Sequence, residues 1–388
     1  MRILLVCSRY PPAVGGVETH VQTLGQLLSR RGHQVRILTS DVETVTPFRR
    51  IRDEKVSRIA PPIPDVSRVV GYPVIPTVDS LGVFAPGFLG VSSMADQFDV
   101  VHLHSYGYSS SLLPTLVPGM RRHPVVITPH TLADPRLRRR LYDSTLGPWT
   151  LRFARRVIAL TNSEAHFLST IGVAPVRIRV IPNGVELSRL RAVPNEPRAS
   201  PDSPPHPRIA FVGRMTRSKG VRVLVDAVAT LVTRHPYLEL LLIGPRSAYS
   251  RQVNSQISAS GLQRNIRFVS NLSREEYVEM LRSSSALVLP SLTGEAQGVV
   301  LLEAMALDVP IVASDIGGIP ETVGPDIASS LVRPGDSLAL AGAIERVLSD
   351  PSFRDRLIVA GRKHIVRYDW SDLVVQIEQV YREAIVES

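Results

Sequence analysis

Cysteine is almost absent from this chain of 388 residues, which contains only Cys7. One cysteine cannot form a disulfide within the chain, so the sequence favours a reducing compartment. Because Cys7 lies inside the first apolar run, we interpret it as a core side chain rather than a nucleophile. No apolar run reaches the roughly 20 residues that span a bilayer, and the first run is too short for a signal peptide. We therefore expect a cytoplasmic protein.

Aromatic residues are also scarce, at 5% of the chain, and they do not interleave with the basic clusters. No nucleic-acid-binding module is recognisable either, so we expect no nucleic-acid partner. The apolar fraction of 44% and the charged fraction of 21% are typical of a folded globular protein. The length is sufficient for two domains.

The net charge of +10 lies entirely in the first half of the sequence. Residues 1–190 contain 23 Lys and Arg against 13 Asp and Glu, whereas residues 191–388 contain 22 of each. The surplus clusters at Arg49, Arg50 and Arg52, at Arg121 and Arg122, at Arg136 with Arg138–Arg140, and at Arg152, Arg155 and Arg156. Two interpretations stay open, an anionic membrane surface and ordinary solvated faces.

The first 40 residues read as strand, helix and strand. Apolar runs predict strands at Arg2–Ser8 and Gln34–Thr39, and a helical period predicts a helix over Gly16–Arg31. The loop before this helix ends in Gly15 and Gly16, which would let a ligand phosphate approach the helix start. A plain tight turn is the alternative, and the G-x-G-x-x-G dinucleotide fingerprint is absent.

A histidine follows one of the next predicted strands. Asp99–His104 and Pro124–Thr128 are predicted strands, and His130 comes directly after the second. The carboxyl end of a parallel strand borders the ligand crevice of a doubly wound sheet, so we predict that His130 contacts a ligand. Residues Tyr72–Met94 are apolar but interrupted by Pro and Gly, and we interpret them as an irregular loop with short helices.

Residues 191–207 contain six prolines and are predicted to be a linker. Strand and helix patterns alternate before the linker and start again at residue 208. The sequence therefore predicts an α/β protein with two Rossmann-like domains facing a central cleft, one over residues 1–190 and one over residues 208–370. A final amphipathic helix, within residues 371–388, is expected to cross back to the first domain.

The most informative stretch is Pro290–Leu307, which is predicted to be a loop and a helix after a buried strand. It places Glu295 in the loop, Gly298 near the helix start and Glu303 inside the helix. Free N–H groups at a helix start bind phosphate, and the two carboxylates would accept hydrogen bonds from sugar hydroxyls, which together describe a sugar nucleotide. A capping residue and a solvated helix face would be the structural alternative.

Two cations follow the first strand of the second predicted domain. Gly213 and Arg214 end this strand, and Lys219 lies five residues beyond Arg214. At the carboxyl edge of a parallel sheet, two cations can bind a diphosphate in place of a divalent metal. No Asp-x-Asp pair occurs in the sequence, so we expect neither a metal site nor a cofactor.

Taken together, these motifs resemble those of the family 4 retaining glycosyltransferases, which have the GT-B fold. The resemblance covers nearly the whole chain. It implies that residues 1–190 form the acceptor-side domain and that residues 208–370 bind the nucleotide sugar. It rests on Gly15-Gly16 with Glu18, on His130, on IPNGVE at Ile181–Glu186, on VGR…KG at Val212–Gly220, and on the Glu-x7-Glu pair Glu295–Glu303 followed by Ala-Met-Ala. One departure is Gln297, where the family often has Phe.

The resemblance implies a role for each matched residue. Arg214 and Lys219 would bind the donor diphosphate, Glu295 the donor sugar, and Glu303 the ribose hydroxyls. His130 would contact the donor sugar and its oxocarbenium-like centre. The residues implied in contacts to donor phosphate are Gly16, Gly298, Val299 and Val300. Gln297 would alter the shape of the donor-sugar pocket.

The expected activity is transfer of a hexose from a UDP- or GDP-linked sugar to an acceptor hydroxyl, in glycolipid, cell-wall or polysaccharide biosynthesis. A front-face attack is expected because no carboxylate is an obvious nucleophile. The basic first half predicts peripheral binding to the inner membrane face and a lipid-linked acceptor. A GT-B sugar-nucleotide epimerase and a catalytically silent sugar-nucleotide-binding protein stay open as alternatives.

Overall fold

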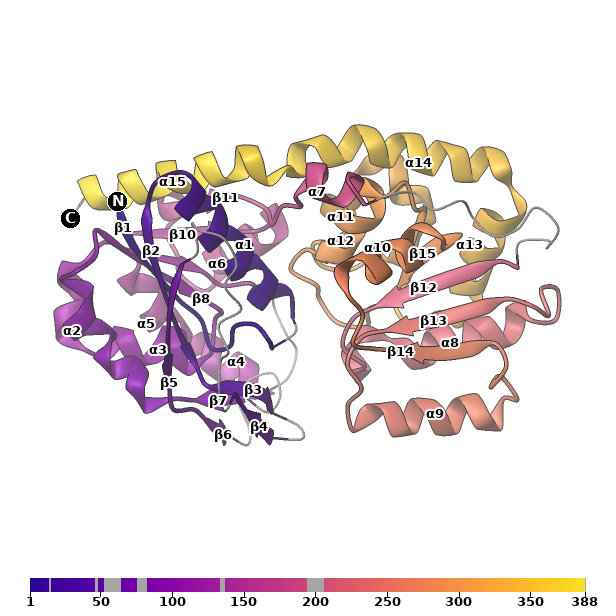
Figure 1. Cartoon of the computed structure of the whole chain (residues 1–388), viewed down its shortest axis with the longest axis horizontal. Coiled ribbons are helices and arrows are strands. Elements are labelled where there is room, and N and C mark those ends of the chain that lie inside the picture. Colours follow the sequence, from indigo (N-terminus) through magenta and orange to yellow (C-terminus); the bar gives the residue numbers. More distant parts are fainter. Residues whose placement is uncertain are drawn as a thin grey trace. The chain divides into compact units, whose positions relative to one another are not determined.

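The computed structural model describes residues 1–13, 15–45, 48–51, 64–74, 82–132, 137–193 and 206–387. Contacts divide the chain into two compact units (Figure 1), unit 1 with Met1–Asn183 and Ser371–Ser388, and unit 2 with Gly184–Trp370. Most of the predicted linker, 191–207, lies outside the described residues. Each unit is a Rossmann-like α/β layer structure with one parallel sheet, which confirms the predicted fold class.

The sheet of unit 1 has seven parallel strands in the order β11-β10-β9-β8-β1-β2-β5. From β1 the chain first builds outward through β2 and β5, and then returns to the other side of β1 with β8. Ligands of such sheets bind where the strand order reverses, which is here between β1 and β8. The strands are β1 Arg2–Val6, β2 Gln34–Ser40, β5 Asp65–Val69, β8 Val100–His104, β9 Val125–Thr128, β10 Arg156–Ala159 and β11 Ile178–Val180.

The strands of unit 1 are covered on both faces. All of Ile3–Val6 and all of β8 are buried, as expected for strands between two helix layers. Cys7 is also fully buried, which confirms its role in the core. The helices of this unit are α1 Gly16–Arg30, α2 Val91–Ala95, α3 Ser109–Thr115, α4 Leu137–Ser144, α5 Leu146–Phe153 and α6 Asn162–Thr170.

The stretch predicted as an irregular loop, Tyr72–Met94, contains regular structure at both ends of a gap in the described residues. Strands β6 Tyr72–Val74 and β7 Gly82–Phe84 pair antiparallel, and the 3-10 helix Pro86–Gly90 leads into α2. A second hairpin joins β3 Val42–Val45 to β4 Phe48–Arg50. The prediction of a loop was therefore wrong for the strands and correct for the short helices.

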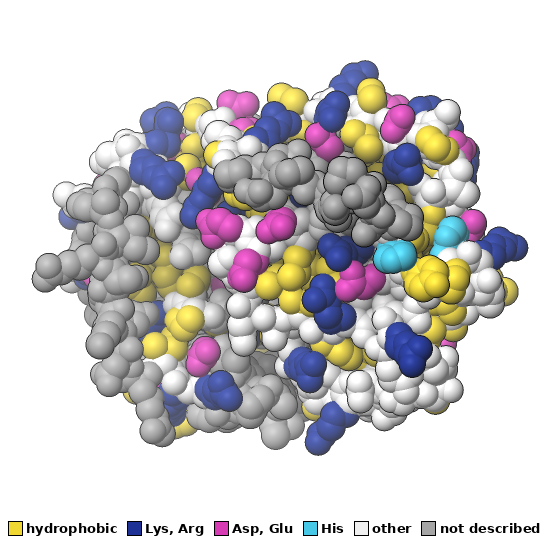
Figure 2. Space-filling model, turned by 45° about the vertical axis from the view of Figure 1, so that its right-hand side comes forward, with side chains coloured by type: hydrophobic (Ala, Val, Ile, Leu, Met, Phe, Trp, Pro, Cys, Tyr) yellow, Lys and Arg dark blue, Asp and Glu magenta, His cyan; other side chains and the backbone are white. Residues whose placement is uncertain are grey.

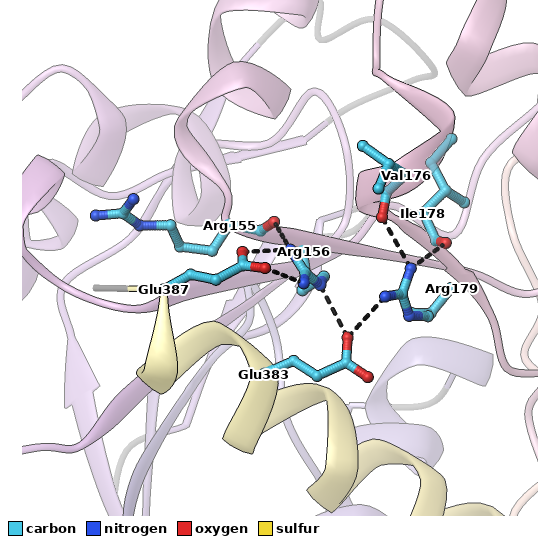
Figure 3. Close-up of polar contacts among 7 residues, drawn as sticks. All are labelled: Arg155, Arg156, Val176, Ile178, Arg179, Glu383 and Glu387. Carbon is cyan, nitrogen blue, oxygen red and sulfur yellow. Dashed lines mark hydrogen bonds and ion pairs between the residues drawn. The ribbon is translucent and has the colours of Figure 1, made fainter.

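The last helix, α15 (Trp370–Val386), docks on unit 1 through buried and ionic contacts. The hydroxyl of Tyr381 lies 2.8 Å from Nδ1 of His102 on β8. Glu383 and Glu387 both accept hydrogen bonds from Arg156 on β10, as Figure 3 shows. Glu383 of this helix and Glu387 just after it thus pair with Arg156, one member of a basic cluster seen in the sequence.

Unit 2 contains a six-stranded parallel sheet in the order β14-β13-β12-β15-β16-β17. Here the order reverses between β12 and β15, so the loops after these two strands border the expected ligand site. The strands are β12 Arg208–Val212, β13 Glu239–Ile243, β14 Ile266–Val269, β15 Ala286–Leu289, β16 Ile311–Ser314 and β17 Leu331–Val332. The helices are α7 Leu187–Arg191, α8 Val221–Leu231, α9 Tyr249–Ala259, α10 Arg274–Arg282, α11 Val299–Ala306, α12 Ile319–Val323, α13 Ser337–Ser349 and α14 Pro351–Ile365.

Surface charge differs from the sequence-based expectation at one cluster. Arg136 and the side chain of Arg138 lie outside the described residues, but Arg139 is only 1% exposed and pairs with Asp143. Arg139 is therefore not available for a membrane contact and is not a solvated surface residue either. On the face shown in Figure 2, Lys and Arg side chains are interspersed with Asp and Glu. Among the described residues, no helix has the length and apolar character needed to cross a bilayer.

Candidate active site

The loop after β12 carries the two predicted phosphate-binding cations. Arg214 is exposed, and Lys219 ends a 3-10 turn, Arg217–Lys219. The next residue, Gly220, has a φ of 67°, and a Cβ there would lie 1.8 Å from the carbonyl oxygen of Pro290. Only glycine allows this close approach, which holds the cation loop against the loop after β15. Nearby, the N–H of Leu292 donates to the carbonyl of Ser218 over 2.7 Å.

The loop after β15 places Glu295 beside Lys219, and the two side chains form an ion pair. The hydroxyl of Ser291 also donates to Glu295 Oε1 over 2.8 Å. Burial by itself raises the pKa of Glu295, but the charge and hydrogen bond of Lys219, with help from Ser291 and Arg214, lower this pKa below its usual value. Glu295 is therefore an ionised acceptor next to a cation, at the point where the strand order reverses.

Helix α11 starts directly after this loop. Gly298, with a φ of 83°, precedes the helix, and no side chain caps the N–H groups of the first turn, which includes Val299 and Val300. These amides can bind a phosphate oxygen. The preceding Gln297 is only 2% exposed, and its carbonyl accepts a 2.9 Å hydrogen bond from Thr322 on α12. Gln297 thus belongs to the packed base of the loop.

Glu303 lies within α11, where the sequence predicted it, and contacts a tyrosine from α10. The hydroxyl of Tyr277 donates to Glu303 Oε2 over 2.5 Å. Burial raises the pKa of Glu303, while this hydrogen bond and the nearby charge of Arg274 lower it. Tyr277 fixes one carboxylate oxygen and leaves the carboxylate with further acceptor capacity for a ligand hydroxyl.

In unit 1, the glycine loop precedes α1. A Cβ at Gly15 would lie 2.2 Å from a carboxylate oxygen of Glu18, so a larger residue there would displace this acid. Glu18 is buried and pairs with Arg9 over 2.7 Å. A Cβ at Gly16 would meet no atom within 4 Å, which shows open space beside the helix start. The predicted phosphate approach would use this space.

His130 follows β9 with a φ of 53°, an uncommon conformation for a residue other than glycine. Its Nε2 lies 3.3 Å from Nδ1 of His104, which ends the neighbouring strand β8. The ring of His20 from α1 packs edge-on against His130, with centroids 4.9 Å apart. Burial and the neighbouring imidazoles lower the pKa of His130 well below its usual value, so this ring is neutral at pH 7.

A buried carboxylate fixes the backbone next to His130. Glu164 on α6 accepts hydrogen bonds from the N–H groups of Thr131 and Leu160, over 2.6 and 2.7 Å. Burial raises the pKa of Glu164 to about 7, despite these amides and Arg139. Arg139 donates to the hydroxyl of Thr131 over 2.5 Å. These residues support the loop that presents His130.

The sequence did not predict several of these contacts. The sequence contains one signal that was not used, because His104 ends a parallel strand next to the strand that His130 follows. The same rule that singled out His130 therefore applies to His104. Tyr277 and Glu164 carry no local signal, since Glu303 and Thr131 lie on other elements. Ser291 lies in the same loop as Glu295, but no motif marks it as a partner of this acid.

Comparison with known proteins agrees with this arrangement. A family model described as "Glycosyltransferase Family 4" matches residues 14–189, and one described as "Glycosyl transferases group 1" matches residues 194–364. A phosphatidyl-myo-inositol mannosyltransferase of Mycobacterium leprae is 30% identical over 387 residues, which cover 98% of this chain and 96% of that protein. Both halves of the chain are therefore covered by the comparison.

Solved structures also match the fold of the whole chain. Sucrose-phosphate synthase from Thermosynechococcus elongatus has a TM-score of 0.77 with 26% identity, and the match covers 100% of both chains. Anabaena HepE in complex with UDP-glucose has a TM-score of 0.76 with 20% identity, again over 100% of both. The chain belongs to the family 4 glycosyltransferases and has the GT-B fold.

Proposed function

We propose that this glycosyltransferase moves a hexose from a nucleoside diphosphate sugar to a hydroxyl of a phospholipid-anchored acceptor, with retention of configuration. One observation is the main support for binding of the sugar donor. Lys219, Glu295 and the start of α11 lie together where the strand order of unit 2 reverses. A cation, an ionised acceptor and free backbone N–H groups match a diphosphate joined to a sugar.

In the proposed mechanism, positive groups stabilise the leaving diphosphate. Arg214, Lys219 and the first amides of α11 would face the charge that develops as the glycosidic bond breaks. These groups take the place of a metal ion at the donor. Lys219 forms an ion pair with Glu295 before the donor binds. The incoming phosphate then replaces Glu295 as the partner of Lys219, and Glu295 accepts hydrogen bonds from the sugar instead.

The neutral state of His130 suits the proposed contact with the donor sugar. A protonated imidazole would repel the positive charge of an oxocarbenium-like centre, whereas a neutral ring can turn a nitrogen lone pair toward it. Burial keeps this ring neutral across the physiological range. The support from Glu164 and Arg139 to the adjacent Thr131 fixes the position of this ring.

A lipid acceptor is supported by the name of the Mycobacterium leprae relative and by one surface of unit 1. We define the η2–α5 patch as the exposed residues Arg121 and Arg122 of the 3-10 helix η2 (Pro118–Arg122) with Leu146, Trp149 and Arg152 of α5. The guanidinium of Arg121 stacks over the ring of Trp149, 5.5 Å from its centroid. Arginine next to an exposed indole suits the headgroup region of an anionic bilayer.

The donor is tested by thermal shift against UDP-, GDP- and ADP-linked sugars, because a ligand that binds the native state raises the melting temperature. Radiolabel transfer to phosphatidylinositol vesicles then tests the acceptor. We expect stabilisation by one nucleotide class and transfer only when lipid is present. Conversion of the donor without any acceptor would indicate an epimerase, and failure of every donor to bind would contradict the proposal.

Membrane binding is tested separately. Trp370 is 3% exposed and Trp149 is 43% exposed, so brominated lipids should quench Trp149 if the patch enters the headgroup region. The double change Arg121→Glu with Arg122→Glu removes at least about 2 kcal/mol of attraction, or roughly thirtyfold in partitioning to anionic vesicles. Arg234→Glu with Arg264→Glu, two exposed arginines of unit 2, is the control. Equal loss in both double variants would contradict docking through the patch.

A further inference from the structure

Three histidines from separate elements of unit 1 meet in one place. His20 lies on α1, His104 ends β8 and His130 follows β9. One ring nitrogen of each lies within 4.8 Å of those of the other two. His20 and His104 are buried, and His130 is half-buried. A donor sugar contact requires only His130, so the other two rings have no role in the proposed transfer.

The spacing of these nitrogens approaches that of a metal centre. Zinc binds imidazole nitrogens at about 2.0–2.1 Å in a tetrahedral site, which separates neighbouring nitrogens by roughly 3.3–3.4 Å. Nδ1 of His104 and Nε2 of His130 are already 3.3 Å apart. Small side-chain rotations of His20 would complete a three-nitrogen set around one ion.

One ring of the cluster also has an unsatisfied nitrogen in addition to the one that lies beside His130. Nε2 of His104 is buried without a hydrogen-bond partner among the described residues, which is rare for a buried polar atom.

A second layer of contacts holds the cluster in place. His102 stacks beside His104 with ring centroids 4.0 Å apart. Its two nitrogens lie 2.8 Å from the hydroxyls of Thr128 and Tyr381. The hydrogen bonds hold the ring of His102 in place, and its stacking restricts one face of His104.

We propose that His20, His104 and His130 bind a divalent transition-metal ion of the Zn²⁺ class. A set of three imidazoles without a carboxylate favours Zn²⁺, Co²⁺, Ni²⁺ or Cu²⁺ over Mg²⁺ or Ca²⁺. Half-buried His130 leaves a fourth position open to water or another ligand. One consequence rests on the proposed function: a bound ion occupies the lone pair of His130, so the ion inhibits transfer and a chelator relieves the inhibition.

Binding is tested on the full-length protein after treatment with a chelator and dialysis. Co²⁺ titration is followed by its visible absorbance, and Zn²⁺ affinity is measured by competition with a chromophoric chelator. We expect one equivalent per chain and no response to Mg²⁺. His20→Gln and His104→Gln should each weaken binding by more than the about 10–100-fold that loss of an outer contact costs. His166→Gln, an exposed histidine on α6, should bind like the wild type.

Two results would overturn the site: no Co²⁺ band in the wild type, or equal affinity in the wild type and both cluster variants. Circular dichroism and thermal melting of each variant show whether it is folded, and the two cluster variants are independent of each other. If Zn²⁺ binds with the expected loss in the variants but leaves transfer unchanged, the role of His130 in the proposed function is wrong while the metal site stands.

Discussion

Lys219 and Glu295, separated by 75 residues in the sequence, form an ion pair at the edge of the second sheet. The pair depends on the close approach of Gly220 to Pro290, which brings the two loops together. Each partner is the residue that a nucleoside diphosphate sugar would need, one for phosphate and one for sugar. The two charges thus satisfy each other. Under the proposed function, the donor would replace this ion pair by a contact from Lys219 to phosphate and one from Glu295 to the sugar.

Lys219→Ala should weaken binding of the donor and of the free nucleoside diphosphate. The variant loses a charge-assisted contact of about 1.5–3 kcal/mol, which corresponds to roughly tenfold or more in affinity. Arg214→Ala should have a similar effect, because its exposed guanidinium is free to reach phosphate. Calorimetric titration measures the change, with Lys363→Ala, an exposed lysine on α14, as the control. Unchanged donor affinity in both variants would exclude the phosphate role.

The two acids should affect different steps. Glu303→Gln should mainly weaken nucleoside diphosphate binding, since a ribose hydroxyl loses its charged acceptor. Glu295→Gln should mainly lower turnover and leave affinity for the free nucleoside diphosphate nearly unchanged. Tyr277→Phe removes the hydrogen bond to Glu303 and should weaken nucleotide binding by about 0.5–1.5 kcal/mol. Equal loss of nucleotide affinity in the Glu295 and Glu303 variants would show that the roles are not separate.

Arg139 and Arg140 are adjacent arginines with opposite environments. Arg139→Ala should destabilise the protein by about 3–5 kcal/mol, because it leaves Asp143 without its buried partner. Arg140 is exposed, so Arg140→Ala should change the free energy of unfolding by less than about 0.5 kcal/mol. Urea denaturation of the two variants tests the difference. Equal stability would mean that Arg139 is not buried in solution.

Glu164 should make stability depend on pH. Its folded-state pKa of about 7 lies above the ordinary 4.5, so the native state keeps a proton that the unfolded chain has already lost. The free energy of unfolding should therefore fall as pH rises from about 4.5 to 7, by up to about 3 kcal/mol. Glu164→Gln should flatten this slope, although the amide also loses one backbone contact. An identical pH slope in the variant would contradict the assignment.

Gly220→Ala should destabilise unit 2 and lower donor affinity together. The new Cβ would overlap the carbonyl of Pro290, and a φ of 67° is itself costly for alanine, so we expect a loss of about 1–3 kcal/mol. Gly342 lies within α13 and has open space around it, so Gly342→Ala should stabilise the protein by about 0.5–1 kcal/mol. Chemical denaturation measures both, and a neutral Gly220→Ala would show that the loops do not touch.

The sequence was most informative where local pattern decides structure. Short apolar runs located β1, β12 and β15 to within a few residues. The sequence placed Glu295 in the loop after one predicted strand and Lys219 after another, and the structure brings these two side chains together at one sheet edge. Edge strand β5, with the sequence DVSRV, was missed because it has few apolar residues.

What the sequence did not show depends on distant partners. Arginine is usually exposed, so the basic run did not show that Arg139 is buried. The ring of Phe167, 5.7 Å from its guanidinium, lies 28 residues further along the chain. Tyr277 carries no local sign of its contact with Glu303, which lies 26 residues away. The three histidines come from one helix and two strand ends, and their spacing in the sequence matches no metal-binding motif.

Docking of α15 has a consequence for the order in which the two units are completed during synthesis. Residues 184–370 emerge from the ribosome before residue 371, so unit 2 has its full sequence while unit 1 still lacks its last helix. Before this segment is synthesised, His102 lacks its contact with the hydroxyl of Tyr381. Arg156 likewise lacks its hydrogen bonds to Glu383 and Glu387. Domains of a chain usually fold from the N-terminus onward. Here unit 1 is the first to be synthesised in part, but it obtains its last helix only after the whole of unit 2 has been synthesised.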